Sequence, residues 1–180
     1  LLSFLLVAAL MDNPANGVNS LDEVGSIIIP VLSATVMWLA AFNIRHPWRK
    51  KASSFLGDGG SMTLGFLVAW VAVRLSAGYD PSYAVPHVVA LWIVALPVLD
   101  MTACLIRRTF FEEVTPMTSD RKHMHHMLMA SGVSHARTVV ILNAIAIVLA
   151  ISGITLWQIG VQPHLMFWSL IAVGCAYTII

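Results

Sequence analysis

The chain has 180 residues, of which 58% are hydrophobic and only 11% are charged. Soluble domains carry about 25% charged residues, so the composition excludes an ordinary soluble domain and indicates an integral membrane protein. The formal net charge of +1 gives no reason to expect nucleic acid as a partner.

Apolar segments follow one another along the chain, and none alternates strictly as a membrane barrel strand does. Residues 1–10 are too short to cross a bilayer, which takes about 20 residues. We interpret them as the end of a truncated helix, in a chain that is the C-terminal part of a longer protein. The other expected segments are residues 26–44, 61–77, 85–106, 138–157 and 164–180. We therefore expect an all-α fold, a polytopic transmembrane helix bundle within a single multi-spanning domain.

The basic residues are distributed unevenly between the loops. Of the ten Lys and Arg residues, four lie in the loop 45–60 and five in 107–137. The alternate loops 11–25, 78–84 and 158–163 contain none. Cytoplasmic loops carry the excess of Lys and Arg in membrane proteins. We expect both basic loops, and the C-terminus, to face the cytoplasm.

A glycine-rich motif occupies residues 55–61, where three glycines surround the carboxylate of Asp58. Glycine lets the backbone come close to a ligand, and a carboxylate is an oxygen donor that Mg²⁺ prefers beside phosphates. We expect Ser61 to cap a helix that begins there, with amide N–H groups facing an anion. An ordinary turn with an N-cap explains the same residues, so this motif alone leaves both interpretations open.

Three of the seven histidines lie within four positions, at His123, His125 and His126. On a helix, His123 and His126 share a face and His125 points elsewhere. Arg121 and Lys122 directly precede them. Charge-assisted donors of this kind suit the many oxygens of a pyrophosphate.

Two other interpretations of the histidine segment stay open. Histidine is a common zinc ligand, although the two cysteines, Cys104 and Cys175, are not close in sequence. The segment can also be a solvated polar loop with incidental histidines, an interpretation that the density of histidines disfavours.

Two polar residues at the ends of apolar segments are further candidates. A carboxylate such as Asp100 is costly near a bilayer unless it is paired or close to water. It can pair with Arg107 or Arg108, which we favour, or it can orient a histidine. Asn43, at the end of the segment 26–44, can cap that helix or hydrogen-bond a ligand.

In combination and in this order, these motifs resemble those of the polyprenyl-phosphate N-acetylhexosamine-1-phosphate transferases. The resemblance runs from about residue 26 to the end of the chain and includes Pro97 spaced three residues before Asp100. The His-x-His-His pattern is most similar to the undecaprenyl-phosphate N-acetylglucosamine-1-phosphate transferases of this family.

The resemblance implies a multi-pass transferase of the bacterial inner membrane with its active site on the cytoplasmic face. It implies transfer of an N-acetylhexosamine 1-phosphate, in the form of GlcNAc-1-phosphate, from a UDP-sugar to undecaprenyl phosphate, with release of UMP. That reaction is the first membrane step of cell-envelope polysaccharide synthesis, which includes cell wall and lipopolysaccharide. The implied cofactor is Mg²⁺, with Mn²⁺ as an alternative. The implied partners are a UDP-N-acetylhexosamine and a polyprenyl phosphate lipid, and a homodimer stays open.

Residue roles follow from the same resemblance. Asp58 matches a metal-binding aspartate, and the three histidines match a motif that holds the donor's phosphates and sugar. The expected catalytic residues are Asp58, His123, His125 and His126. The expected substrate-binding residues are Asn43, Phe55, Arg121 and Lys122.

The sequence departs from the family's pattern in one respect. The family also carries an Asp-Asp pair and an Asp-Gly-x-Asp-Gly motif upstream, and this sequence contains neither. Two alternatives from other classes therefore stay open. One is a cation-coupled transporter fragment, with Asp58, Asp100 and the histidines as a cation pathway, and the other is a non-catalytic fragment.

Overall fold

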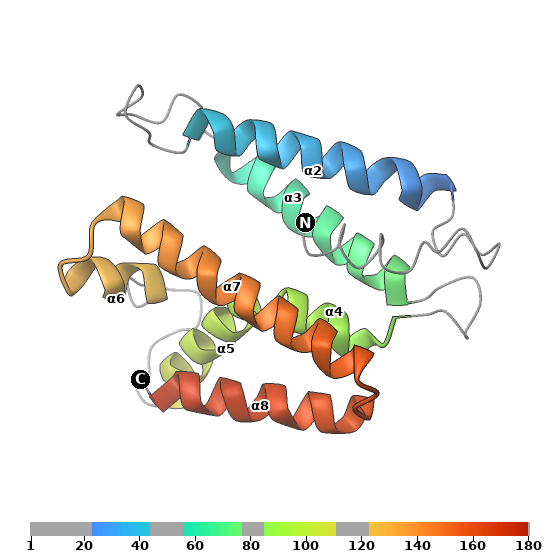
Figure 1. The fold of residues 1–180 in the computed structure, drawn as a ribbon. Helices are drawn as coiled ribbons and strands as arrows, with labels where there is room; N and C mark the ends of the chain where they lie inside the picture. The colour runs from blue at the N-terminus through green and yellow to red at the C-terminus, as the bar shows by residue number, and fades with distance from the viewer. Residues whose placement is uncertain (1–22, 44–55, 77–84, 111–122, 180) are drawn as a thin grey trace. The chain divides into compact units, whose positions relative to one another are not determined.

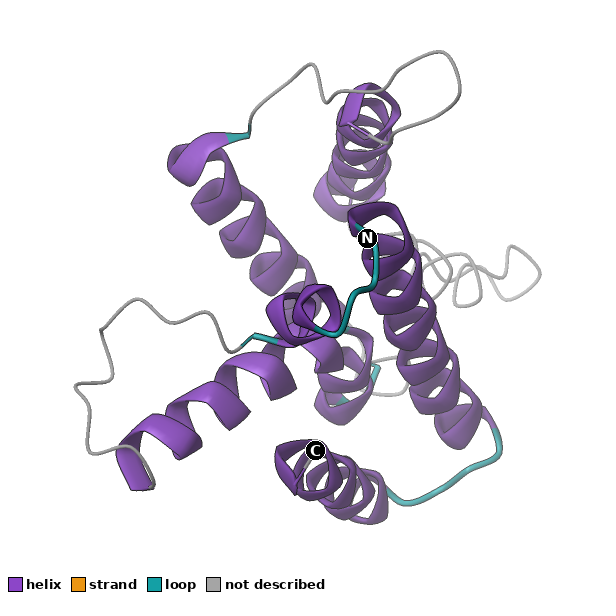
Figure 2. Cartoon of the chain, turned by 90° about the vertical axis from the view of Figure 1, so that its left-hand side faces the viewer, coloured by secondary structure: helices purple, strands orange, loops and turns teal. Residues whose placement is uncertain are grey.

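The computed structural model describes residues 23–43, 56–76, 85–110 and 123–179. Every regular element within these ranges is an α-helix, which confirms the all-α fold (Figure 2). The helices are α2 (Glu23–Asn43), α3 (Gly57–Ser76), α4 (His87–Ile93), α5 (Ala95–Phe110), α6 (Met124–Ala130), α7 (His135–Gln158) and α8 (Pro163–Ile179). The chain divides after Ala90 into two compact units.

The first unit contains α2 and α3, which lie side by side and run in opposite directions (Figure 1). Ile29 on α2 and Val71 on α3 are buried, but many large apolar side chains of both helices are exposed. Trp38 and Phe66 are two of them, each with 69% of its surface accessible. Apolar surface of this extent marks a site of contact with a membrane or a partner, in agreement with the composition.

The second unit is built around α5, which packs against α7 and α8. The two long helices α7 and α8 also contact each other, and the short α6 packs against α7 (Figure 1). The buried indole of Trp92 donates a hydrogen bond from Nε1 to the backbone carbonyl of Met166, at 3.1 Å. This bond satisfies the one polar group of a large apolar side chain and ties α4 to α8.

The expected apolar segment 85–106 consists of two helices with a break between them. The axes of α4 and α5 are bent by 80° at Val94. Pro97 gives the physical reason, because proline lacks an N–H and its ring clashes with the carbonyl four residues earlier. That carbonyl belongs to Ile93, where α4 ends, and Pro97 itself lies in the first turn of α5, where proline is tolerated.

Apolar length varies between the helices. Among the described residues, α7 is long and apolar enough to cross a membrane by itself. The bent pair α4 and α5 passes the same test when it is taken as one broken span, and α2 contributes a shorter apolar stretch, Ile27–Asn43. The described helices thus have the apolar character expected of a membrane protein.

Residues 57–61 of the glycine-rich motif are helical, and Ser61 is therefore not the N-cap that we expected. Gly57 has a φ of 67°, a left-handed conformation that glycine adopts without strain, and α3 begins at this residue. Ser61 lies one turn inside the helix, where its hydroxyl donates to the carbonyl of Asp58 at 2.9 Å. The free amide groups of the helix start therefore belong to residues 57–60.

Candidate active site

The three histidines lie at the start of α6. His123 is the N-cap residue with an extended backbone, at φ −68° and ψ 152°, and its carbonyl accepts the first hydrogen bonds of the helix. His125 and His126 lie in the first turn of α6. All three side chains are partly exposed, so the cluster is open to a ligand.

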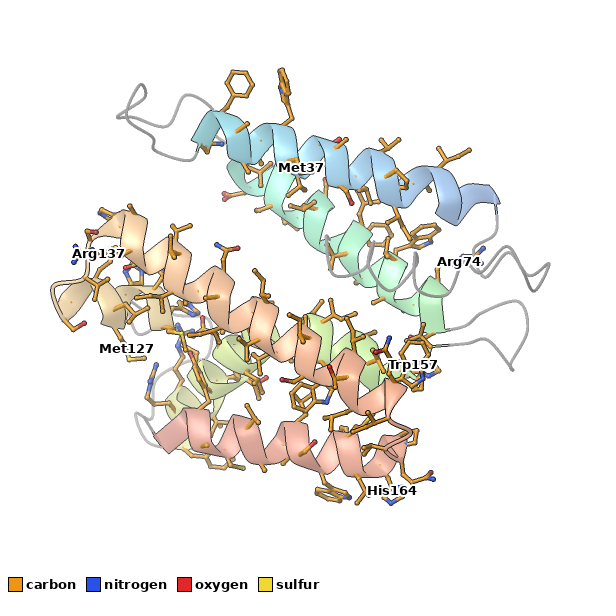
Figure 3. The ribbon with its side chains drawn as sticks, in the orientation of Figure 1. Met37, Arg74, Met127, Arg137, Trp157 and His164 are labelled. Carbon is orange, nitrogen blue, oxygen red and sulfur yellow. The ribbon has the colours of Figure 1, made fainter. Side chains whose placement is uncertain are left out.

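A tight turn fixes α6 against α7. Gly132 follows the end of α6 with a φ of 88°, and its N–H bonds the carbonyl of Met129 while that of Val133 bonds Leu128. This paired bonding closes a helix end at a left-handed glycine. Figure 3 shows the result, with Met127 on α6 and Arg137 in the first turn of α7 at the same end of the unit.

The imidazole rings form one group, contrary to the expectation that His125 points away from the other two. The ring centroids of His125 and His126 are 4.0 Å apart, and those of His123 and His125 are 5.9 Å apart and stacked. The expectation assumed that all three residues are helical. It is wrong because His123 lies before the helix in extended conformation, where helical spacing does not apply.

Asp100, on α5, holds the cluster in place. Its Oδ2 lies 2.9 Å from Nδ1 of His123, and its Oδ1 accepts the backbone N–H of Met124 at 3.0 Å. Of the roles that the sequence left open for Asp100, the structure therefore shows that it orients a histidine. The side chains of His123 and Asp100 expose 25% and 21% of their surface, which shields their contact from full solvation.

Tyr177 is a member of this group that the sequence did not reveal. Its hydroxyl donates to Oδ1 of Asp100 at 2.5 Å from the last turns of α8. Tyr177 and Asp100 are 77 positions apart, and no motif surrounds the tyrosine. The expected topology offered one clue, because it places the C-terminus on the same side of the membrane as the histidine segment.

His125 differs electrostatically from a solvated histidine. Burial, followed by the neighbouring His126 and His123, lowers the pKa of His125 below its ordinary 6.5, and Asp100 acts in the opposite direction. Near neutral pH this ring is therefore mainly uncharged. It can hydrogen-bond a ligand without adding a positive charge of its own to the cluster.

A cleft of about 200 Å³ adjoins the cluster. Its lining combines apolar and polar groups of α5 with the first histidine, and consists of Met101, Thr102, Cys104, Leu105, Arg108 and His123. The guanidinium of Arg108 and the imidazole of His123 thus share one concave surface. Such a pairing of donors can bind the oxygens of an anion.

Asp58 and Asn43 belong to the other compact unit. Asp58 is exposed in the first turn of α3, and Asn43 is the partly buried last residue of α2. A carboxylate in the first turn is favoured by the helix dipole and is accessible to a cation. Among the described residues, no three His, Cys, Asp or Glu side chains are grouped to hold a metal ion.

Three of the expected substrate-binding residues, Phe55, Arg121 and Lys122, lie outside the described residues. Their predicted roles are therefore unchanged by the structure.

Proteins of known name are similar to more than half of this chain. The chain is 36% identical over 101 residues to a protein of Salmonella typhi, which covers 56% of this chain and 27% of the relative. It is 35% identical over 100 residues to a protein of Escherichia coli strain K12, and the match covers 56% of this chain and 26% of that protein. It is 29% identical over 153 residues to a protein of Pasteurella multocida strain Pm70, and the match covers 85% of this chain and 41% of that protein.

All three relatives are named undecaprenyl-phosphate alpha-N-acetylglucosaminyl 1-phosphate transferase. The chain is a homologue of these transferases. The resemblance predicted from the motifs is thereby confirmed, and the chain spans less than half the length of the transferases it matches. No family model and no solved structure matches the chain.

Proposed function

We propose that the protein to which this chain belongs transfers N-acetylglucosamine 1-phosphate from a UDP-sugar to undecaprenyl phosphate and releases UMP. The reaction takes place at the cytoplasmic face of the bacterial inner membrane and begins the synthesis of a cell-envelope polysaccharide. The observation that carries the proposal is the histidine cluster, oriented by Asp100, in a homologue of transferases that are named for this group transfer. Those names favour a transferase over a cation-coupled transporter.

Phosphoryl transfer depends mainly on positioning and on neutralising charge. The histidine cluster supports both requirements for the donor's pyrophosphate. Its rings form one group beside Arg108 at the cleft. Hydrogen bonds from several fixed donors restrain a flexible diphosphate and stabilise the charge that develops on its oxygens.

Asp58 is a described residue that fits a magnesium ion. Mg²⁺ is commonly bound by one or two carboxylates together with substrate phosphates, not by an all-protein cage. The exposed carboxylate of Asp58, at the start of α3, suits that kind of site. When bound, Mg²⁺ would neutralise the negative charge of the phosphates, and Asp58 would hold it.

The test is a transfer assay on the full-length protein in membranes. We expect radiolabelled GlcNAc-1-phosphate to move from UDP-GlcNAc to undecaprenyl phosphate, with UMP released in equal amount. Omission of Mg²⁺ should stop the reaction, and Mn²⁺ should restore part of it. A protein that binds neither UDP-GlcNAc nor the lipid, or that forms no lipid-linked product, contradicts the proposal.

A further inference from the structure

Asp100 makes three hydrogen bonds, to the adjacent residues His123 and Met124 and to the distant Tyr177. Oδ1 accepts the hydroxyl of Tyr177 at 2.5 Å and the N–H of Met124 at 3.0 Å, and Oδ2 lies 2.9 Å from Nδ1 of His123. A backbone N–H can only donate, and an ionised carboxylate can only accept. The arrangement fits an ionised Asp100 that accepts from all three partners.

An ionised Asp100 determines the proton position on His123. Because Oδ2 can only accept, the Nδ1 atom of His123 must carry the hydrogen. With Nδ1 bonded to Asp100, Nε2 is left to act on a ligand, and it can donate to a phosphate oxygen when the ring is protonated, because both nitrogens of imidazolium donate. His123 lines the cleft together with Arg108, and the ligand that enters there meets this ring.

The same carboxylate fixes the start of α6. The side chain of His123, the N-cap residue, makes no capping bond to the helix. The first amide of the helix, that of Met124, is instead satisfied by Asp100 from α5. An unsatisfied helix start costs free energy, so Asp100 stabilises the turn that carries His125 and His126 as well as the ring of His123.

Tyr177 acts on the histidines through Asp100. It donates to the oxygen that also accepts from Met124, which limits rotation of the carboxylate. Hydrogen bonds to charged groups are stronger than those between neutral groups. Tyr177 lies near the end of α8, 77 positions from Asp100 in sequence. The end of α8 thereby helps to support the histidine cluster.

We propose that Asp100 and Tyr177 are positioning residues of the transferase site. Together they hold His123 with Nδ1–H on Asp100, so that Nε2 faces the ligand and, in the protonated ring, donates its own N–H to the phosphates of the donor substrate. Neither residue touches the substrate. This inference rests on the proposed function, but the state of the histidine ring can be measured without any turnover.

The first experiment is nitrogen NMR on the full-length protein with ¹⁵N-labelled histidine, with the His123 signals assigned by His123→Gln. We expect Nδ1 of His123 to carry a proton in the unmodified protein. Tyr177→Phe, which removes one oxygen and keeps the ring, should lower the fraction of His123 rings with a proton on Nδ1, and Asp100→Asn should lower it more strongly. A His123 without a proton on Nδ1 in the unmodified protein, or an unchanged ring in both variants, overturns the proposal.

The second experiment measures kinetics with a matched control. Loss of a group that orients a metal-binding histidine typically costs 10- to 100-fold. Taking the same scale for an orienting partner of a phosphate-binding histidine, we expect kcat to fall roughly tenfold in Tyr177→Phe with little change in KM for the lipid. Thr178→Val is the control, since the neighbouring hydroxyl bonds the carbonyl of Cys175 in its own helix. Equal kcat values in Tyr177→Phe and Thr178→Val overturn the positioning role.

The two experiments separate the inference from the proposed function. If the unmodified protein transfers no sugar phosphate, the proposed function fails, and the NMR result still decides whether Asp100 and Tyr177 orient His123. If Asp100→Asn does not fold, Tyr177→Phe alone decides. Hydrogen exchange at residues 124–130 adds a third measurement, because loss of the carboxylate should accelerate exchange of the Met124 amide.

Discussion

Asp58 is the residue on which the proposed metal chemistry depends most directly. It provides the acidic side chain of the first turn of α3, and it is exposed. The helix is held by its own backbone and packing, so the charge of Asp58 is available for a ligand.

In the full-length protein, Asp58→Asn is expected to reduce Mg²⁺-dependent transfer while expression stays normal. A lost metal ligand removes several kcal/mol of charge stabilisation, which corresponds to roughly a hundredfold or more in rate. UMP release measures the effect. Thr63→Ala, which removes an exposed hydroxyl that bonds the carbonyl of Gly59 in the same helix, is the control and should leave the rate unchanged. Near-normal turnover in Asp58→Asn contradicts the metal role.

The histidines are expected to bind phosphate and not zinc. His123→Ala and His126→Ala should weaken use of the UDP-sugar, seen as a higher KM or a lower kcat, without loss of any bound transition metal. The adjacent Arg121 and Lys122 explain this, because they repel a cation and attract an anion. Metal analysis of the purified protein and of each variant gives the measurement.

His164→Ala is the matched control for these variants. His164 is exposed in the first turn of α8, at the opposite end of that helix from Tyr177 (Figure 3), and its loss should change neither donor use nor metal content. Stoichiometric zinc that disappears in His123→Ala and His126→Ala would reject phosphate binding and point to a metal-dependent hydrolase.

At the scale of elements, the packing of Trp92 against α7 and α8 holds the second unit together. A Cβ added at Gly153 of α7 would clash with Cβ of Trp92 and lie 2.6 Å from its Cγ. Trp92 cannot move away freely, because it is buried and its indole bonds Met166. Gly153 is therefore required by close helix contact.

Gly153→Ala is expected to destabilise the protein by about 1–3 kcal/mol, the usual cost of overpacking a core. The melting temperature in detergent measures the loss. Gly65→Ala is the control, because a Cβ there meets nothing within 4 Å and alanine favours a helix over glycine. A melting temperature of Gly153→Ala equal to that of Gly65→Ala contradicts the close packing of α4 on α7.

For the whole molecule, the distribution of Lys and Arg predicts that both basic loops lie in the cytoplasm. A cytosolic nucleotide sugar can reach the histidine cluster only in this orientation. The prediction is tested with single cysteines, after Cys104 and Cys175, which form no disulfide, are replaced by serine. A membrane-impermeant thiol reagent added outside intact cells should label Asp80→Cys and miss Lys50→Cys and Lys122→Cys. The opposite labelling pattern would overturn the topology.

The sequence by itself determined the helical class and the similarity to the transferases. The first follows from apolar segments, which specify helices in a membrane because a lipid environment leaves few ways to satisfy the backbone. The second follows from short motifs that keep their order and spacing. Both kinds of information are local in the chain, so they are readable without coordinates.

Only the tertiary structure decided which residues support the histidines. The bond from Tyr177 to Asp100 joins positions 77 apart, and no local pattern records such a contact. The sequence favoured an arginine partner for Asp100, whereas the fold places His123 against it. The contact between Asp100 and His123 requires the helix break before Pro97 and the start of α6 at Met124. The packing of α5 against α7 and α8 brings these distant side chains together.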